Sequence, residues 1–182
     1  MSDPLEIVIL EDNLDRRIVM RDCLTERFPQ YAVRYFVTAG EMIAFLQNKL
    51  PCVLAIALDH DLDLIPIDPR RSLDPGTGRD VADFLATKVP TCPVLIHTTN
   101  SPAAVGMRRE LAESGWTTDR VIPSDGENWI RSEWLPQLRN LIVDAVGHTG
   151  EVPSTAAITE PKSDLWSGAA QPLATLVTAS CG

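Results

Sequence analysis

The stretch LAIALDHDLD, residues 54–63, decides the fold prediction for this chain. Its first half is an unbroken apolar run, which is typical of a strand buried on both faces of a parallel sheet. Its second half holds Asp59, His60, Asp61 and Asp63. Because burying carboxylates is costly unless they meet protons, hydrogen bonds or a cation, we expect this strand to deliver a chemically active cluster to the edge of a sheet.

On both sides of this stretch, short apolar runs alternate with apolar residues at helical spacing. Strands are predicted at residues 5–10, 31–37, 52–58, 94–96 and 120–122. Helices are predicted after the capping residues Asn13, Thr38, Thr77 and Ser101, and over 129–145 with Pro136 in a first turn or at a break. Five β-α repeats with short connections predict an α/β fold: a five-stranded parallel, doubly wound sheet in a three-layer α/β/α arrangement. Residues 59–76 are expected to form a long irregular loop, and a loop of this length inside a compact domain is usually functional or disordered.

The composition limits the kinds of partner. The 182 residues hold 16 Lys and Arg against 25 Asp and Glu, a net charge of -9, which argues against binding a long nucleic-acid duplex. A small phosphorylated ligand held by a few arginines stays compatible with it. The absence of a signal-like N-terminus, of a membrane-length apolar run and of cysteines at metal-ligand spacing predicts a cytoplasmic protein without membrane contact. Residues 1–146 are expected to form the domain, and 147–182, rich in Ala, Thr, Ser and Pro, a flexible or loosely docked tail.

In doubly wound sheets, ligands bind beyond the carboxyl ends of the strands. The polar clusters fall there: Glu11 and Asp12 after the first strand, residues 59–63 after the third and 97–100 after the fourth. His60 and His97 are two of only three histidines, and such a pair can act as general base and general acid on a phosphodiester. Asp59 and Asp61 are candidates for holding the imidazoles in the required tautomer.

Cations for a phosphate are also available. A bidentate clamp is predicted from among Arg16, Arg70, Arg71 and Arg79, and the sequence leaves open which of them points inward. Backbone amides near the predicted helix start at Thr77-Gly78 would add an anion site. Simpler interpretations stand beside these: Arg70 and Arg71 as solvated charges, His97 as a hydrogen-bonded core residue, and Glu11-Asp12 as a solvated turn.

Residues 5–146 resemble a response-regulator receiver domain. The resemblance implies that Glu11 and Asp12 help hold Mg²⁺, that Asp59 accepts a phosphoryl group, and that Asp61 gives a backbone carbonyl to the metal. It also implies that Thr98 contacts the phosphoryl group. One element of a receiver is missing: the end of the fifth strand reads VIPS, residues 121–124, without the expected lysine, and the nearest cations are Arg120 and Arg131.

A second resemblance accounts for the features in which this sequence differs from an ordinary receiver domain. The segments LDHDL (58–62), TG (77–78) and HTTN (97–100), with Met107 and Leu111, are similar to the receiver-derived family of cyclic-phosphate-processing receiver-like domains. It implies action on cyclic phosphates, at RNA termini or on nucleotides, with Asn100 joining Thr98, Gly78 and the arginines near the substrate. We therefore expect a phosphoesterase-like domain. Two alternatives stay open: a single-domain receiver phosphorylated on Asp59, and a pseudo-receiver that binds a ligand without catalysis.

Overall fold

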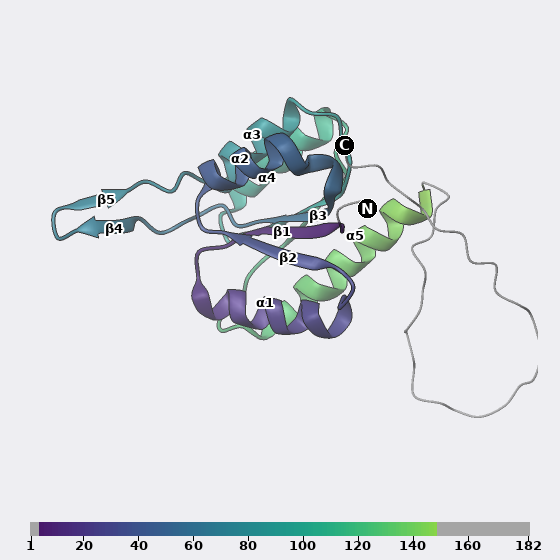
Figure 1. Ribbon diagram of the computed structural model, residues 1–182, viewed down its shortest axis with the longest axis horizontal. Coiled ribbons are helices and arrows are strands. Elements are labelled where there is room, and N and C mark those ends of the chain that lie inside the picture. Colours follow the sequence, from purple (N-terminus) through teal and green to yellow (C-terminus); the bar gives the residue numbers. More distant parts are fainter. Residues whose placement is uncertain (1–3, 149–182) are drawn as a thin grey trace, which may run out of the picture.

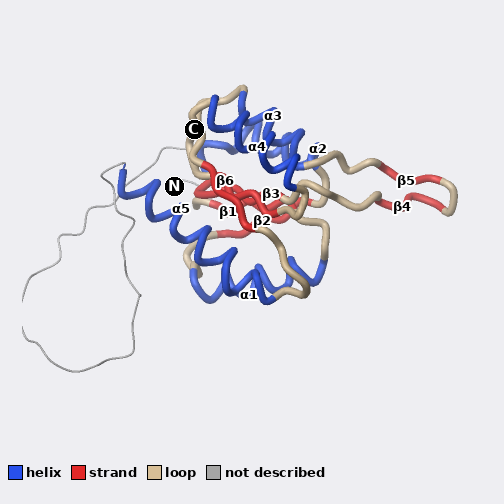
Figure 2. The backbone as a smooth tube through the Cα atoms, turned by 180° about the vertical axis from the view of Figure 1, so that it is seen from behind, coloured by secondary structure: helices blue, strands red, loops and turns tan. Residues whose placement is uncertain are grey.

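The computed structural model describes residues 4–148 and shows three layers, with helices on both faces of a five-stranded parallel sheet (Figures 1 and 2). Its strands are β1 (Glu6–Leu10), β2 (Ala32–Phe36), β3 (Val53–Leu58), β6 (Val94–His97) and β7 (Thr118–Val121). They lie in the order β2-β1-β3-β6-β7, which is the flavodoxin-like order of a doubly wound fold. The predicted fold class is confirmed.

The helices divide between the two faces of the sheet. One face is covered by α1 (Leu14–Arg27), the π-helix η2 (Ile130–Trp134) and α5 (Leu135–His148), and the other by α2 (Ala39–Lys49), α3 (Gly78–Ala86) and α4 (Ser101–Glu113). Because side chains alternate along a strand, Ile9 and Ala57 pack toward α1 and α5, whereas Leu10 and Leu58 pack toward α2, α3 and α4. This alternation decides which polar side chains meet at the strand ends.

Three of the four predicted helix caps are confirmed. The side chain of Asn13 accepts the N–H of Arg16 at 3.0 Å, Thr38 caps α2, and Thr77 forms a capping box with α3. The prediction for α4 was wrong by one residue. Asn100 is the cap, and Ser101 is already the first helical residue, because the Asn100 side chain reaches the helix amides that a cap must satisfy.

The segment between β3 and α3 was predicted to be irregular, and this prediction was wrong. The segment contains an antiparallel hairpin. Its strands β4 (Ile65–Asp68) and β5 (Arg71–Leu73) extend away from the rest of the fold (Figure 1). The sequence pattern missed them because Pro66 and Pro69 normally argue against strands. Pro66 is tolerated in β4 because that strand has only one paired edge, and Pro69 lies in the turn that joins the two strands.

The last helical region also departs from a regular helix. It begins with the five-residue π-helix η2 and continues as α5, where Pro136 occupies the first turn, as predicted. α5 ends at His148, two residues beyond the predicted domain limit of 146, and the rest of the predicted tail lies outside the described residues. Among residues 4–148, no helix has both the length and the apolar character that crossing a bilayer requires.

Candidate functional site

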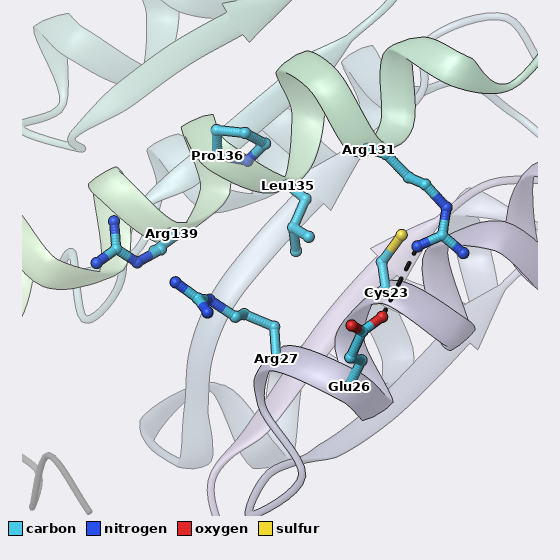
Figure 3. Close-up of a pocket in the computed structure, with 7 residues that line it drawn as sticks. All are labelled: Cys23, Glu26, Arg27, Arg131, Leu135, Pro136 and Arg139. Atoms are coloured by element: carbon cyan, nitrogen blue, oxygen red, sulfur yellow. Dashed lines mark ion pairs between the residues drawn. The ribbon is translucent and has the colours of Figure 1, made fainter. Parts of the chain in front are cut away.

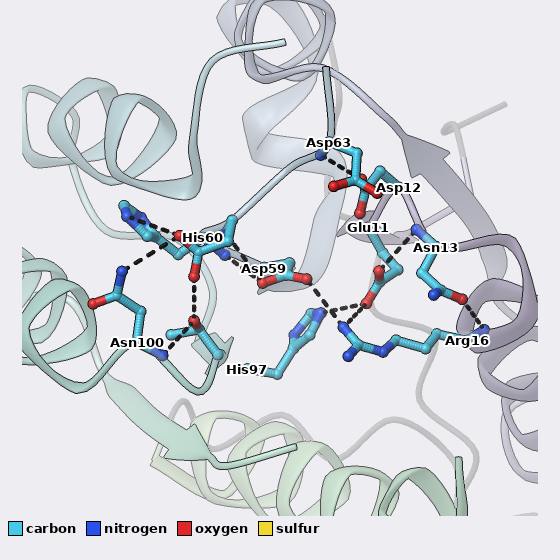
Figure 4. A network of polar contacts seen from close by, with 11 residues as sticks. Glu11, Asp12, Asn13, Arg16, Asp59, His60, Asp63, His97 and Asn100 are labelled. Atoms are coloured by element: carbon cyan, nitrogen blue, oxygen red, sulfur yellow. Dashed lines mark hydrogen bonds and ion pairs between the residues drawn. The ribbon is translucent and has the colours of Figure 1, made fainter. Parts of the chain in front are cut away.

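Three ionisable side chains meet at the carboxyl edge of the sheet, on the face covered by α1 and α5 (Figure 4). Leu10, Leu58 and Ile96 are register partners on β1, β3 and β6. The residue that follows each of them is Glu11, Asp59 and His97, respectively. They therefore stand abreast, and one ligand atom from each lies within 4.8 Å of the others. Their exposed fractions are 0%, 4% and 0%.

Arg16 brings a cation to this buried cluster. The N-cap Asn13 places Arg16 in the first turn of α1, where its Nη1 donates to Oδ2 of Asp59 at 3.3 Å. The same nitrogen lies 3.6 Å from Oε2 of Glu11, and the guanidinium stacks over the indole of Trp129 at 5.7 Å from the ring centroid. Of the four candidate arginines, Arg16 is the one that reaches the cluster.

His97 lies between a carboxylate and two indoles. Its Nε2 is 3.3 Å from Oε2 of Glu11, and its ring centroid is 6.1 Å from Trp129 and 6.2 Å from Trp134, with Trp134 presenting its edge. Both tryptophans are buried in the core, with exposed fractions of 1% and 0%. Sequence reasoning missed that they enclose His97, because nothing in the spacing of two apolar residues shows what they pack against.

The environment shifts the pKa values of the two carboxylates in opposite directions. Burial raises the pKa of Asp59 to about 6, the nearby Glu11 adds to the rise, and His97 and Arg16 oppose it. Burial also acts to raise the pKa of Glu11, but the contact with His97, the amide of Asn13 and Arg16 outweigh it and lower that pKa. Glu11 is therefore the carboxylate that stays ionised, and Asp59 is the one that exchanges a proton near neutral pH.

A second polar cluster lies beside the first, around Asp61. Its carboxylate accepts from the Thr98 hydroxyl and from the Asn100 side-chain amide, both at 3.3 Å. Nε2 of His60 lies 3.8 Å from the same group. In Figure 4 the ring of His60 points away from His97, toward Asn100. Thus the predicted substrate-side pair Thr98 and Asn100 comes together here, away from the buried cluster.

The two histidines therefore do not share one pocket. Each has its own carboxylate: Glu11 for His97, and Asp61 for His60. The side chain of His60 is largely buried, with 15% of it exposed. The backbone of His60 explains this position. The N–H of His60 donates to Oδ1 of Asp59 at 2.7 Å, which forms a tight turn directly after β3.

The remaining predicted arginines lie elsewhere. Arg79 points along α3 to Asp83 at 2.6 Å and across to Glu110 at 3.7 Å. Arg70 and Arg71 are exposed on the β4–β5 hairpin, which extends away from the cluster (Figure 1). Sequence spacing could not separate these cases, since the direction of a long side chain depends on its tertiary partners.

The predicted anion site at the start of α3 is occupied by the protein's own groups. The N–H of Thr77 donates to Asp80 at 2.7 Å, and the N–H of Gly78 donates to the His60 carbonyl at 3.2 Å. Gly78 has a packing role instead: a Cβ there would lie 2.2 Å from the carbonyl oxygen of Asp59. A glycine is therefore needed for α3 to approach the end of β3.

The comparisons with known proteins agree with this geometry. The model of the cyclic-phosphate processing receiver domain matches residues 7–113. The chain belongs to this family. No curated protein matches its sequence.

Solved structures show that this cyclic-phosphate processing receiver has the receiver fold. The response regulator domain of Thermotoga maritima CheB is similar with a TM-score of 0.53 and 16% identity, over 78% of this chain and 98% of that one. A CheY-like receiver domain from Methanospirillum hungatei gives 0.52 and 15%, over 78% and 99%. The non-phosphorylated receiver domain of Escherichia coli RcsB gives 0.50 and 18%, over 82% and 96%.

The receiver resemblance implied Mg²⁺ held by Glu11, Asp12 and Asp59 and by the backbone carbonyl of Asp61. Of the three side chains, the structure groups Glu11 and Asp59 together, and the N–H of Asp61 donates to Oδ1 of Asp59 at 3.3 Å. Asp12 accepts the N–H of Asp63 at 2.6 Å, and Asp61 contacts Thr98. The third group beside Glu11 and Asp59 is an imidazole, whereas Mg²⁺ prefers oxygen ligands. Glu11 and Asp59 are therefore the oxygen ligands that the buried cluster would offer to such an ion. Arg16 contacts the same two carboxylates, and no step of the proposed reaction is assigned to a metal.

Arg120 is a structural residue that sequence reasoning did not identify. Its Nη2 donates to the Thr98 carbonyl at 3.0 Å and to the Ser101 hydroxyl at 3.2 Å. Because Arg120 lies on the neighbouring strand β7, these two hydrogen bonds fix the turn between β6 and α4 to that strand. The fifth-strand lysine of receivers thus has no direct counterpart, and the cation that contacts Asp59 comes from α1.

Proposed function

We propose that this protein is a phosphoesterase that hydrolyses cyclic phosphates or related phosphodiesters, such as a cyclic phosphate on a nucleotide or an RNA terminus. The observation that carries the proposal is the buried group of Glu11, Asp59 and His97 beside Arg16. An ionisable cluster in an apolar, water-poor setting is costly for stability, and such clusters concentrate at functional sites. Membership of the cyclic-phosphate processing family supports the substrate class.

Asp59 is the group of this cluster that meets the substrate. It keeps a small exposed fraction, 4%, whereas Glu11 and His97 have none. The adjacent Arg16 has 28% of its side chain exposed and supplies N–H donors that match phosphate oxygens. Glu11 and His97 act from behind as positioning residues that control the charge on Asp59.

In the proposed hydrolysis, Asp59 first accepts a proton from water and then donates the same proton to the leaving oxygen. A water oxygen forms a bond to phosphorus while Asp59 takes the water proton, and the bond from phosphorus to the ring oxygen then breaks. Asp59 returns the proton to that leaving oxygen, so the product is a phosphomonoester with a free hydroxyl. A pKa of about 6 for Asp59 suits both steps, because a group with a pKa near the working pH accepts and donates readily.

The test is an assay of 2′,3′-cyclic nucleotides with the full-length protein, with and without added divalent ions. Asp59→Asn and His97→Gln should lower kcat by about 10²-fold or more, the usual range for losing acid–base catalysis. The matched control is Asp22→Asn, which removes an exposed carboxylate on α1 and should leave turnover unchanged. Absence of turnover by the wild type, or full activity of both Asp59→Asn and His97→Gln, would refute the proposal.

The same assay separates this mechanism from one with two histidines. If His60 and His97 were a matched acid and base, His60→Ala and His97→Ala would lower kcat equally. The geometry predicts a smaller loss for His60→Ala, since His60 faces Asp61 and not the buried cluster.

The receiver fold favours a second candidate function, phosphorylation of Asp59 in signalling. Asp59 follows β3, the position of a receiver's phosphoacceptor, but it is nearly buried and paired with Arg16. Acetyl phosphate with Mg²⁺ would give acid-labile phosphate that is lost in Asp59→Asn if this candidate holds. Ligand binding without turnover or labelling would instead indicate a pseudo-receiver.

A further inference from the structure

A hollow lies on the outer surface of the fold, between α1 and the segment formed by η2 and α5 (Figure 3). Its volume is about 500 Å³, in the range of pockets that hold nucleotide-sized molecules. It is lined by Cys23, Glu26, Arg27, Arg131, Leu135, Pro136 and Arg139. None of these residues belongs to the candidate active site.

The hollow is basic although the chain is acidic. Three arginines and one glutamate line it, whereas the whole chain carries a net charge of -9. Arg131 is 3.8 Å from Glu26, and 56% and 79% of these side chains are exposed, so this pair contributes little. Within residues 4–148, no ion pair joins Arg27 or Arg139 to a carboxylate.

The unpaired Arg27 and Arg139 line the same hollow. Figure 3 shows the guanidinium groups of Arg27 and Arg139, which come from different helices, on the same side of the hollow. Like charges held together repel each other, and an anion between them would turn this repulsion into attraction. The planar guanidinium donors match the oxygens of phosphate groups, and the volume exceeds what a single phosphate needs.

We propose that this hollow binds a small anion with two or more linked phosphate groups, at a site separate from the Glu11–Asp59–His97 cluster. The inference does not depend on the proposed phosphoesterase activity. The hollow also touches a segment that matters to the candidate active site. Arg131 lies on the π-helix η2, and Trp134 on the same helix packs against His97. A bound anion would therefore contact the outer side of the element that encloses His97.

The experiment is titration calorimetry of the full-length protein at low salt with three probes: orthophosphate, tripolyphosphate and ATP. Tripolyphosphate should bind, and orthophosphate should bind at least tenfold more weakly. Equal affinity for ATP and tripolyphosphate would identify the phosphate chain as the recognised part. Tighter binding of ATP would identify a nucleotide as the ligand.

Matched variants locate the site. The double variant Arg27→Gln/Arg139→Gln should weaken tripolyphosphate binding at least tenfold. Arg108→Gln/Arg109→Gln removes the same charge from exposed positions on α4 and should change affinity less than twofold. Three results would each overturn the proposal: no binding of any probe, equal losses in both double variants, or loss on Arg16→Gln with Arg27→Gln/Arg139→Gln unaffected. Arg27, Arg108 and Arg109 are exposed and Arg139 is half-buried, and the thermal unfolding midpoint of each variant checks that it remains folded.

Discussion

Replacing Asp59 with asparagine tests the electrostatic description of the buried cluster through stability alone. Burial raises the pKa of Asp59 from an ordinary 3.8 to about 6, so the folded protein disfavours the ionised carboxylate. Since one pKa unit corresponds to about 1.4 kcal/mol, ionisation of Asp59 lowers the free energy of unfolding by about 3 kcal/mol above pH 7. The favourable contribution is complete below pH 3.8 and is lost as the pH rises through about 6.

The variant Asp59→Asn cannot ionise, so its stability relative to wild type should increase with pH. The two titration curves give an increase of about 1.5 kcal/mol between pH 5 and pH 8. The measurement is urea unfolding of both proteins at each pH, with EDTA present so that no divalent ion contributes. The ion pair with Arg16 forms only when Asp59 is ionised, and its effect is already contained in the shifted pKa. Any change in packing around the new amide is the same at both pH values and cancels.

The control for this experiment is Glu113→Gln, which removes an exposed carboxylate at the end of α4. Its stability difference from wild type should stay within about 0.5 kcal/mol at both pH values. A difference between Asp59→Asn and wild type that is flat or falls with pH would refute the raised pKa, and with it the role of Asp59 as a proton carrier near neutral pH.

Three further predictions concern the surroundings of the cluster. Gly78→Ala should destabilise the fold by about 2 kcal/mol or more in urea unfolding, because the new Cβ would lie 2.2 Å from the Asp59 carbonyl; Gly40→Ala, with nothing within 4 Å, should be neutral or slightly stabilising. Arg16→Gln should raise the pKa of Asp59 further, since the guanidinium opposes the rise, and the carboxyl ¹³C shift followed against pH measures this; an unchanged midpoint would contradict the contact. Arg120→Ala should cost about 1–3 kcal/mol by leaving two hydrogen bonds unmade, which thermal unfolding would detect; an unchanged midpoint would remove its positioning role.

Several elements could be predicted because their cause is local. Asn13 and Thr38 satisfy helix amides within three residues, and the apolar run of β3 can only be buried. The hairpin could not be predicted, because Pro66 lies within its first strand, Pro69 lies in its turn, and the two strands pair with each other. Similarly, the sequence places both Arg16 and Arg79 near the start of a helix and cannot tell which of them reaches the cluster. Arg16 pairs with Asp59 and Arg79 with Asp83 because different segments pack beside α1 and α3.

The sequence by itself determined that carboxylates and histidines follow three of the predicted parallel strands at their carboxyl ends. That the three strands are neighbours was implied only by the receiver resemblance, and the sheet order of the structure shows it. Only the tertiary structure decided how residues 54–63 divide their polar groups. Sheet register places Asp59 beside Glu11 and His97, and the alternation of side chains sends the next residue, His60, away from them. The physical reason is that a strand has two faces, and the choice of face depends on register and packing between segments far apart in the chain.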